Sequence, residues 1–85
     1  MLLEYIQAAM DRARYEILSD DGSYYGRIPG FKGLWANAGT LEDCRRELQS
    51  TLEDWILLGI RFGDRLPVVK GIRIRVPKPP RKAAS

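Results

Sequence analysis

Tyr24-Tyr25-Gly26-Arg27-Ile28-Pro29-Gly30, followed closely by Leu34-Trp35-Ala36-Asn37-Ala38, is the stretch that decides the fold of this chain. The alternating side chains of residues 24–28 and 34–38 predict two β-strands, because successive side chains of a strand point to opposite faces. Pro29 and Gly30 separate the strands, since proline has no N–H for a strand ladder and glycine permits a reversal. The stretch therefore predicts a strand, a Pro-Gly corner and a second strand.

A long helix is predicted directly after these strands. Thr40 offers a hydroxyl to the free N–H groups of the first turn, and Asp43 can return the hydrogen bond. Glu42 and Asp43 are also favoured at the partly positive end of a helix. We expect the helix to run from Leu41 to Phe62, with Gly63 as its C-terminal cap. Its apolar stripe is predicted to comprise Leu41, Cys44, Leu48, Leu52, Trp55 and Leu58.

The residues before Tyr24 predict a short helix and one more strand. Leu2 to Arg12 has apolar side chains on one side, and a helix of this length must pack against other elements to persist. Residues 14–18 alternate with period two, and the turn residues Ser19 to Ser23 join them to the next strand as a hairpin. Asp20 and Asp21 lack the further carboxylates of a calcium loop, so we interpret them as part of a solvated turn.

Together these elements predict an α+β fold with two layers. An antiparallel sheet of three to four strands packs on one long helix, and a short N-terminal helix is added. The fourth strand would run from Val68 to Val76, so residues 1–76 form one domain. Residues 77–85 are basic and proline-rich, and we expect them to be a disordered tail. In the strand that follows the corner, Leu34, Ala36 and Ala38 are expected to face the helix.

The second half of the long helix is apolar on nearly all sides. It reads Trp55-Ile56-Leu57-Leu58-Gly59-Ile60, and an exposed helix would not tolerate this composition. We favour a second subunit as the cover, which predicts a homodimer or a higher homo-oligomer. Internal cover by the N-terminal helix or the tail is the alternative. The predicted subunit interface comprises Trp55, Ile56, Leu57 and Ile60.

Charge is distributed unevenly along the 85 residues, whose net charge is +3. Up to Gly63 there are seven basic and ten acidic residues, a net charge of −3, whereas from Asp64 onward there are seven basic residues and one acidic residue, a net charge of +6. An acidic body suits a basic partner, and a basic end can touch phosphate or simply be solvated. Candidate phosphate contacts are Arg73, Arg75, Lys78, Arg81 and Lys82, which have no aromatic residues among them for base stacking.

The sequence offers few side chains that could act in catalysis or bind a metal ion. The chain has no histidine and one cysteine, which removes the common zinc ligand sets and the Ser-His-Asp and Cys-His nucleophilic schemes. No loop has the spacing of a P-loop or a dinucleotide fingerprint. We favour a small buried hydrophobe over a reactive thiol as the role of Cys44. We therefore expect no enzyme activity, metal or cofactor. Without a signal peptide or a membrane-spanning run, the chain is expected to be cytoplasmic.

The motifs at Tyr24–Gly30, Leu34–Asn37 and Thr40–Cys44, in this order and spacing, resemble those of the HicB family of bacterial and archaeal antitoxins. Asn37 stands where that family often has threonine, and Cys44 where it often has alanine. The resemblance implies an RNase H-like core without catalytic carboxylates, commonly in dimers or higher oligomers. It also implies a role in a type II toxin–antitoxin pair, where the chain neutralises a small, basic, mRNA-cleaving toxin of the HicA type. Many members add a C-terminal DNA-binding domain, for which this sequence has no counterpart, so DNA binding is not expected.

Steric occlusion is the mechanism that this resemblance predicts, with an acidic body docking on a basic ribonuclease. The candidate contacts lie on the sheet face away from the long helix and are Tyr25, Arg27, Trp35 and Asn37, because aromatic and arginine side chains commonly anchor interfaces. One alternative is that Tyr25 and Trp35 pack under the N-terminal helix. A second is an orphan HicB-like regulatory or structural module, with weak nucleic-acid binding through its basic end.

Overall fold

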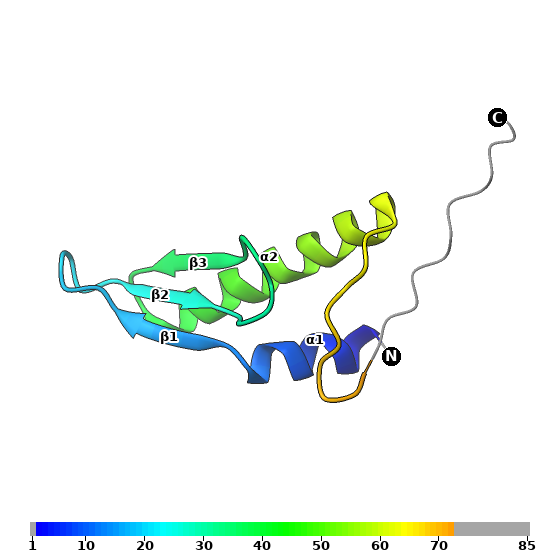
Figure 1. Cartoon of the computed structure of the whole chain (residues 1–85). Helices are drawn as coiled ribbons and strands as arrows, with labels where there is room; N and C mark the ends of the chain where they lie inside the picture. Colours follow the sequence, from blue (N-terminus) through cyan, green and yellow to red (C-terminus); the bar gives the residue numbers. More distant parts are fainter. Residues whose placement is uncertain (1, 73–85) are drawn as a thin grey trace, which may run out of the picture.

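A three-stranded antiparallel sheet and two helices make up the fold, in a computed structural model that describes residues 2–72 (Figure 1). The elements are α1 (Leu2–Asp11), β1 (Arg14–Ile17), β2 (Tyr24–Arg27), β3 (Trp35–Ala38) and α2 (Leu41–Phe62). The strands lie in the order β1-β2-β3, α2 packs on one face of the sheet, and α1 packs against α2. The predicted α+β fold is confirmed, with three strands among residues 2–72.

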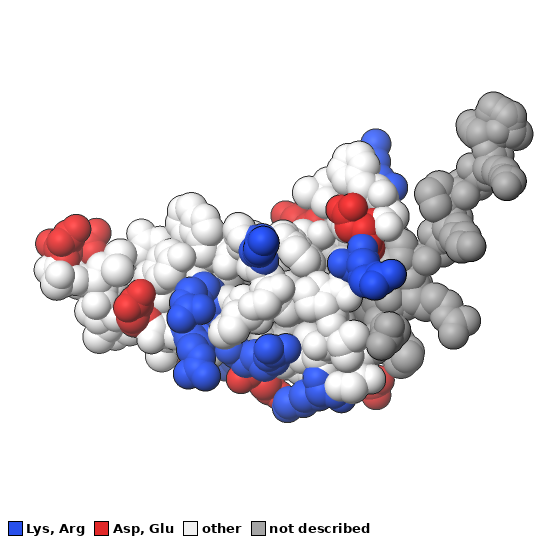
Figure 2. Space-filling model, in the orientation of Figure 1, with Lys and Arg blue, Asp and Glu red and all other residues white. Residues whose placement is uncertain are grey.

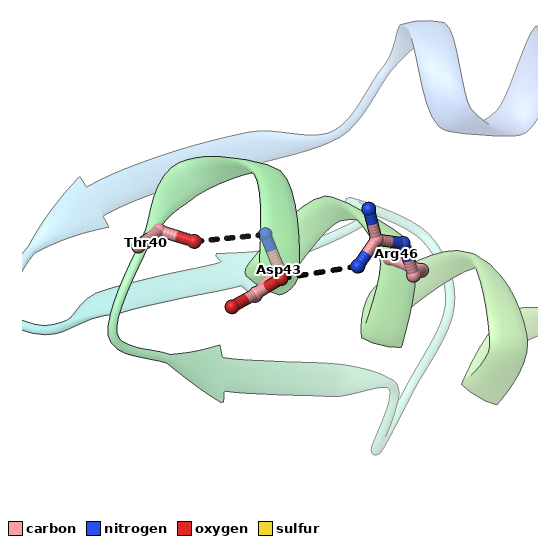
Figure 3. A network of polar contacts seen from close by, with 3 residues as sticks. All are labelled: Thr40, Asp43 and Arg46. Carbon is pink, nitrogen blue, oxygen red and sulfur yellow. Dashed lines mark hydrogen bonds and ion pairs between the residues drawn. The ribbon is translucent and has the colours of Figure 1, made fainter.

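Both ends of α2 are fixed by the caps that the sequence predicts. The Thr40 hydroxyl accepts a hydrogen bond from the backbone N–H of Asp43 at 3.1 Å (Figure 3). The Asp43 carboxylate pairs with Arg46 at 3.1 Å and does not return the predicted hydrogen bond to Thr40. At the other end, Gly63 has a φ of 72°, and the N–H of Asp64 donates to the carbonyl of Gly59 at 2.8 Å. This left-handed cap satisfies carbonyls that the helix leaves free. The predicted range of the helix is confirmed.

The inner face of the sheet is shaped so that α2 can approach closely. A Cβ atom on Gly26 would lie 2.9 Å from the ring of Tyr15 and 3.1 Å from Sγ of Cys44, so only glycine fits at this point of β2. Ala36 on β3 is buried beside it, and the Cys44 thiol points to the Ala36 carbonyl at 3.7 Å. Leu34 and Ala36 are buried and Ala38 packs against the core, which confirms their predicted inward orientation.

Phe31, in the loop between β2 and β3, joins the two helices to the sheet. Its ring lies 6.3 Å from that of Tyr5 on α1 and 5.0 Å from that of Trp55 on α2, measured between centroids. Tyr5 is fully buried, and its hydroxyl donates to the Pro67 carbonyl, which ties α1 to the segment after α2. Burial raises the pKa of the Tyr5 hydroxyl. The core around these rings includes Ala9, Ile28, Leu48, Leu52, Ile56 and Val69.

The apolar stripe of α2 differs from the prediction at Leu41, which is 46% exposed in the first turn, and again in the second half of the helix. Ile56 and Gly59 face the core, whereas Leu58 is 53% exposed and Trp55 is half-buried. The reason is that α2 continues past the end of the sheet (Figure 1). There the segment after the helix packs on it instead, and a Cβ atom on Gly59 would lie 2.7 Å from Cδ2 of Leu66. In its second half the helix therefore buries the side that faces Leu66, and not the side that continues the stripe packed on the sheet.

A tight turn interrupts the predicted strand from Val68 to Val76. Val69 and Ile72 exchange two backbone hydrogen bonds of 3.1 and 2.7 Å. Lys70 and Gly71 between them have φ values of 49° and 74°, both left-handed, as in the two-residue turns that close hairpins. A continuous strand through this point is therefore wrong. The residues after Ile72, including the predicted tail 77–85, lie outside the described residues.

Candidate functional site

The four candidate contact residues lie together on one open face of the sheet. The side chains that point away from α2 form what we call the outer sheet face: Arg14, Glu16, Tyr25, Arg27, Trp35 and Asn37. Trp35 is 54% exposed, and neither Tyr25 nor Trp35 packs against the core. Because α1 packs against α2 instead, the alternative that it covers these two rings is wrong. The predicted orientation of β2 and β3 is confirmed.

Tyr25 and Trp35 form a stacked aromatic pair on this face. Their ring centroids are 6.1 Å apart, and the ring planes differ by 24°. The pair is diagonal across two strands, since Asn37 is directly opposite Tyr25 and Arg27 is directly opposite Trp35. The strand backbone sets the direction in which both side chains leave the sheet, and the stacking of the rings limits their rotation, so less freedom is lost when a ligand covers them. Pre-ordered aromatic side chains that reach the surface are typical energetic centres of interfaces.

A groove of about 430 Å³ extends from this pair to the loop between β2 and β3. It is lined by Tyr25, Arg27, Trp35 and the loop residues 28–34. Gly30 and Gly33 have φ values of 91° and 74°, which allow the loop to fold its buried Phe31 beneath the groove. The Trp55 indole N–H donates to the Lys32 carbonyl at 3.2 Å and holds the loop against α2. The groove is therefore built on fixed elements.

The outer sheet face carries positive charge, which sequence reasoning missed. Arg14 lies directly opposite Arg27, both are exposed, and neither forms an ion pair with another of residues 2–72. Lys32 also lines the groove, whereas Glu16 is the one carboxylate on the face. Figure 2 shows basic side chains across the middle of the face in view, and acidic ones at the tip of the β1–β2 hairpin. Counting the strand register back from the Ser19–Ser23 turn would have paired these arginines.

Asn37 is occupied within the chain. Its Nδ2 atom donates to Oγ of Ser23 at 2.9 Å and to the carbonyl of Tyr24 at 2.7 Å. Ser23 in turn donates from its backbone N–H and its hydroxyl to one carboxylate oxygen of Asp21, which lowers the pKa of Asp21. Asn37 therefore ties β3 to the β1–β2 hairpin with both N–H donors of its amide, and its Oδ1 acceptor has no partner among residues 2–72. Its place on the face is as predicted, but its hydrogen bonds position the strands.

A second exposed apolar surface lies at the C-terminal end of α2. We call Leu57, Leu58 and Phe62 the α2 end surface; their exposed fractions are 60%, 53% and 69%. Trp55 and Ile60, also predicted for a subunit interface, are half-buried and border it. Ile56 has to be removed from that interface, because it is 1% exposed and lies in the core of the monomer. Leu58, which was predicted for the buried stripe, and Phe62, for which no contact was predicted, are exposed on this surface.

Acidic side chains line the exposed side of α2 that precedes this surface. They are Glu42, Asp43, Glu47, Glu53 and Asp54, all exposed. The arginines Arg45, Arg46 and Arg61 offset part of this charge, so α2 keeps a modest negative excess, whereas the outer sheet face is basic. The two candidate surfaces differ in both charge and shape.

Residues 2–72 contain no group of three or more side chains placed to hold a metal ion. Cys44 is fully buried, and burial raises the pKa of its thiol, which confirms that it is a core residue. Neither helix of this part of the chain combines the length and hydrophobicity needed to cross a bilayer. The five basic residues predicted to contact phosphate, from Arg73 to Lys82, lie beyond the described range.

Comparisons with known proteins agree with this fold. A family model described as UPF0150-like matches residues 4–67. The crystal structure of TTHA0281 from Thermus thermophilus is similar over 91% of this chain and 95% of that chain, with 40% sequence identity and a TM-score of 0.82. No curated protein matches. Since the family model covers most of the sequence, the chain belongs to the UPF0150-like family.

Proposed function

We propose that this chain is an antitoxin of the HicB type, which binds a HicA-type mRNA-cleaving toxin and neutralises it by covering its RNA-binding surface. Membership of the UPF0150-like family supports this proposal, together with the HicB-like order of motifs from Tyr24 to Cys44. The observation that carries it is the stacked pair of half-buried Tyr25 and exposed Trp35, which lies beside a preformed groove on a sheet face that neither α1 nor α2 covers. In this proposal the chain performs no chemistry of its own.

Tyr25 and Trp35 are the proposed anchors of the complex, and Arg27 flanks them. Their strands hold them in place before binding, so their burial costs little conformational entropy. Arg14 and Arg27 would meet carboxylates of the toxin, because an unpaired buried charge opposes binding. The acidic side of α2 would act at longer range by attracting a basic toxin and raising the rate of encounter.

Self-association through the α2 end surface is part of the proposal. Leu57, Leu58 and Phe62 would pack against the same residues of a second copy, with Trp55 and Ile60 at the border. An isologous contact of this kind places one patch against itself. Because this surface lies on α2 and not on the outer sheet face, a homodimer or a higher oligomer would leave the toxin site open.

Co-expression with a candidate toxin from a neighbouring gene tests the proposal. We expect the chain to restore growth, and an equimolar amount of purified chain to stop cleavage of mRNA by the purified toxin. Ribonuclease activity of the chain alone would contradict the proposal. Failure of rescue with every neighbouring basic protein, despite normal folding, would instead favour an orphan interaction module.

A further inference from the structure

We propose that the outer sheet face also binds single-stranded RNA. In this proposal, Tyr25 and Trp35 stack on bases, and Arg14, Arg27 and Lys32 contact phosphates. This activity goes beyond toxin neutralisation and does not depend on it. It also differs from the predicted phosphate contacts of the basic C-terminal end, because those residues come without aromatic neighbours.

The aromatic pair supplies a stacking platform. Tyr25 and Trp35 present neighbouring rings, 6.1 Å apart and nearly parallel, on an open three-stranded antiparallel sheet. Aromatic side chains on a sheet surface bind nucleic acids by stacking on unpaired bases, which tolerates any sequence because every base has a π-face. A duplex keeps these faces inside its own stack, so the platform favours a single strand.

The paired arginines on the outer sheet face would be stabilised by a bound anion. Arg14 and Arg27 are directly opposite each other on an exposed face, and like charges in such a pair destabilise a sheet. No carboxylate among residues 2–72 forms an ion pair with either. The next residue across the sheet from Arg27 is Trp35, so one row carries two guanidinium groups and then a ring. In a bound single strand, a base would stack on the ring and the neighbouring phosphates would contact the two guanidinium groups.

Charge also distinguishes this ligand from a protein. A phosphate backbone relieves the repulsion among Arg14, Arg27 and Lys32 along its whole length, whereas a protein must supply a separate carboxylate for each of these charges. Of the nucleic acids, RNA fits better than DNA because of Glu16. This carboxylate lines a groove of about 180 Å³ with Arg14, Tyr25 and Arg27. A carboxylate accepts hydrogen bonds, and the ribose 2′-OH is the donor that DNA lacks.

Fluorescence anisotropy with a labelled, unstructured RNA of about 12 nucleotides tests this inference on the full chain. Trp35→Leu keeps an apolar side chain but removes the stacking plane, and we expect it to weaken binding about tenfold. Leu41→Ala is the control, because it removes an exposed apolar side chain at the start of α2, outside both named surfaces. It should leave the affinity unchanged. Thermal unfolding of both variants checks that they fold.

Salt dependence separates local phosphate contacts from general charge. Arg14→Gln with Arg27→Gln should reduce the slope of log K against log salt by about 1.4, since each phosphate contact on a single strand contributes about 0.7. Arg61→Gln with Arg65→Gln removes the same charge from exposed positions at the end of α2 and should leave the slope unchanged. Both double variants keep any contribution of the basic C-terminal end.

Three outcomes would overturn the inference. The first is an equal loss in the sheet-face and control variants, which would assign binding to net charge or to the C-terminal end. The second is equal affinity for RNA and for DNA of the same sequence, or an RNA preference that survives Glu16→Ala. The third is no binding at low salt. None of these bears on growth rescue, so the toxin proposal stands or fails separately.

Discussion

The outer sheet face and the α2 end surface both expose large apolar side chains, yet they are built in opposite ways. On the sheet, Tyr25 and Trp35 are rings held by strand backbone and bordered by arginines. On α2, Leu57, Leu58 and Phe62 follow a helix side rich in carboxylates. A rigid ring pair among cations suits a ligand with flat faces and negative charge, or the anchored contact of a protein. A mainly aliphatic patch suits another patch like itself.

The lengths of the elements explain why two such surfaces exist. The 22 residues of α2 span about 33 Å, whereas each four-residue strand spans about 13 Å. The sheet therefore covers only the first half of the helix, and α1 and residues 64–72 cover part of the rest. The outer sheet face is open because α1 packs against α2, with its Tyr5 ring against Phe31 of the β2–β3 loop. Because α2 extends beyond the sheet and α1 packs on α2, both the outer sheet face and the α2 end surface stay uncovered.

The largest expected effect concerns the residue that links the two regions. Phe31→Ala should lower the free energy of unfolding by about 3–5 kcal/mol, because it removes a buried ring that contacts both Tyr5 and Trp55. Urea unfolding measures this loss. Lys32→Ala, at the exposed neighbour, should change stability by no more than about 0.5 kcal/mol. A small loss for Phe31→Ala would mean that the loop under the groove is not anchored to the core.

The next effect separates the two surfaces by function. Leu58→Ser with Phe62→Ser should raise the dissociation constant of self-association by a factor on the order of ten or more, because these side chains lose the apolar burial that drives the contact. Analytical ultracentrifugation measures the change. The same variant should still stop mRNA cleavage by the toxin. Unchanged self-association would show that the chain does not associate through α2.

The smallest expected effect lies under the outer sheet face. The Tyr15 hydroxyl is buried without a hydrogen-bond partner among residues 2–72, so Tyr15→Phe should stabilise the fold by about 1 kcal/mol. Burial also raises the pKa of Tyr15. Above about pH 10 the unfolded chain therefore ionises first, and stability falls as the pH rises. Tyr15→Phe should make this alkaline loss shallower in thermal melts. A destabilised variant would mean that the hydroxyl has a partner.

Local chemistry made much of the fold predictable. Thr40 and Gly63 mark the ends of α2, because caps depend on nearby residues alone. Alternation from Leu34 to Ala38 gave β3 two faces, and the small side chains of Ala36 and Ala38 favoured the face that packs on the helix. The burial of Phe31 and the choice of Ile56 over Leu58 depend on where α1 and Leu66 pack, which no local pattern records. The candidate site was predicted in its aromatic residues but not in its charge. Arg14 and Arg27 are thirteen positions apart and meet only through the strand register.

The central claim is that the outer sheet face, and not the α2 end surface, covers the toxin. Titration calorimetry of the cognate toxin with Trp35→Ala and with Phe62→Ala tests it most directly, because each variant removes one exposed ring. An anchor residue is worth about 2 kcal/mol or more, so Trp35→Ala should weaken binding by a factor on the order of thirty with unchanged thermal stability, and Phe62→Ala should bind as the wild type does. Full affinity for Trp35→Ala, or a larger loss for Phe62→Ala, would contradict the account.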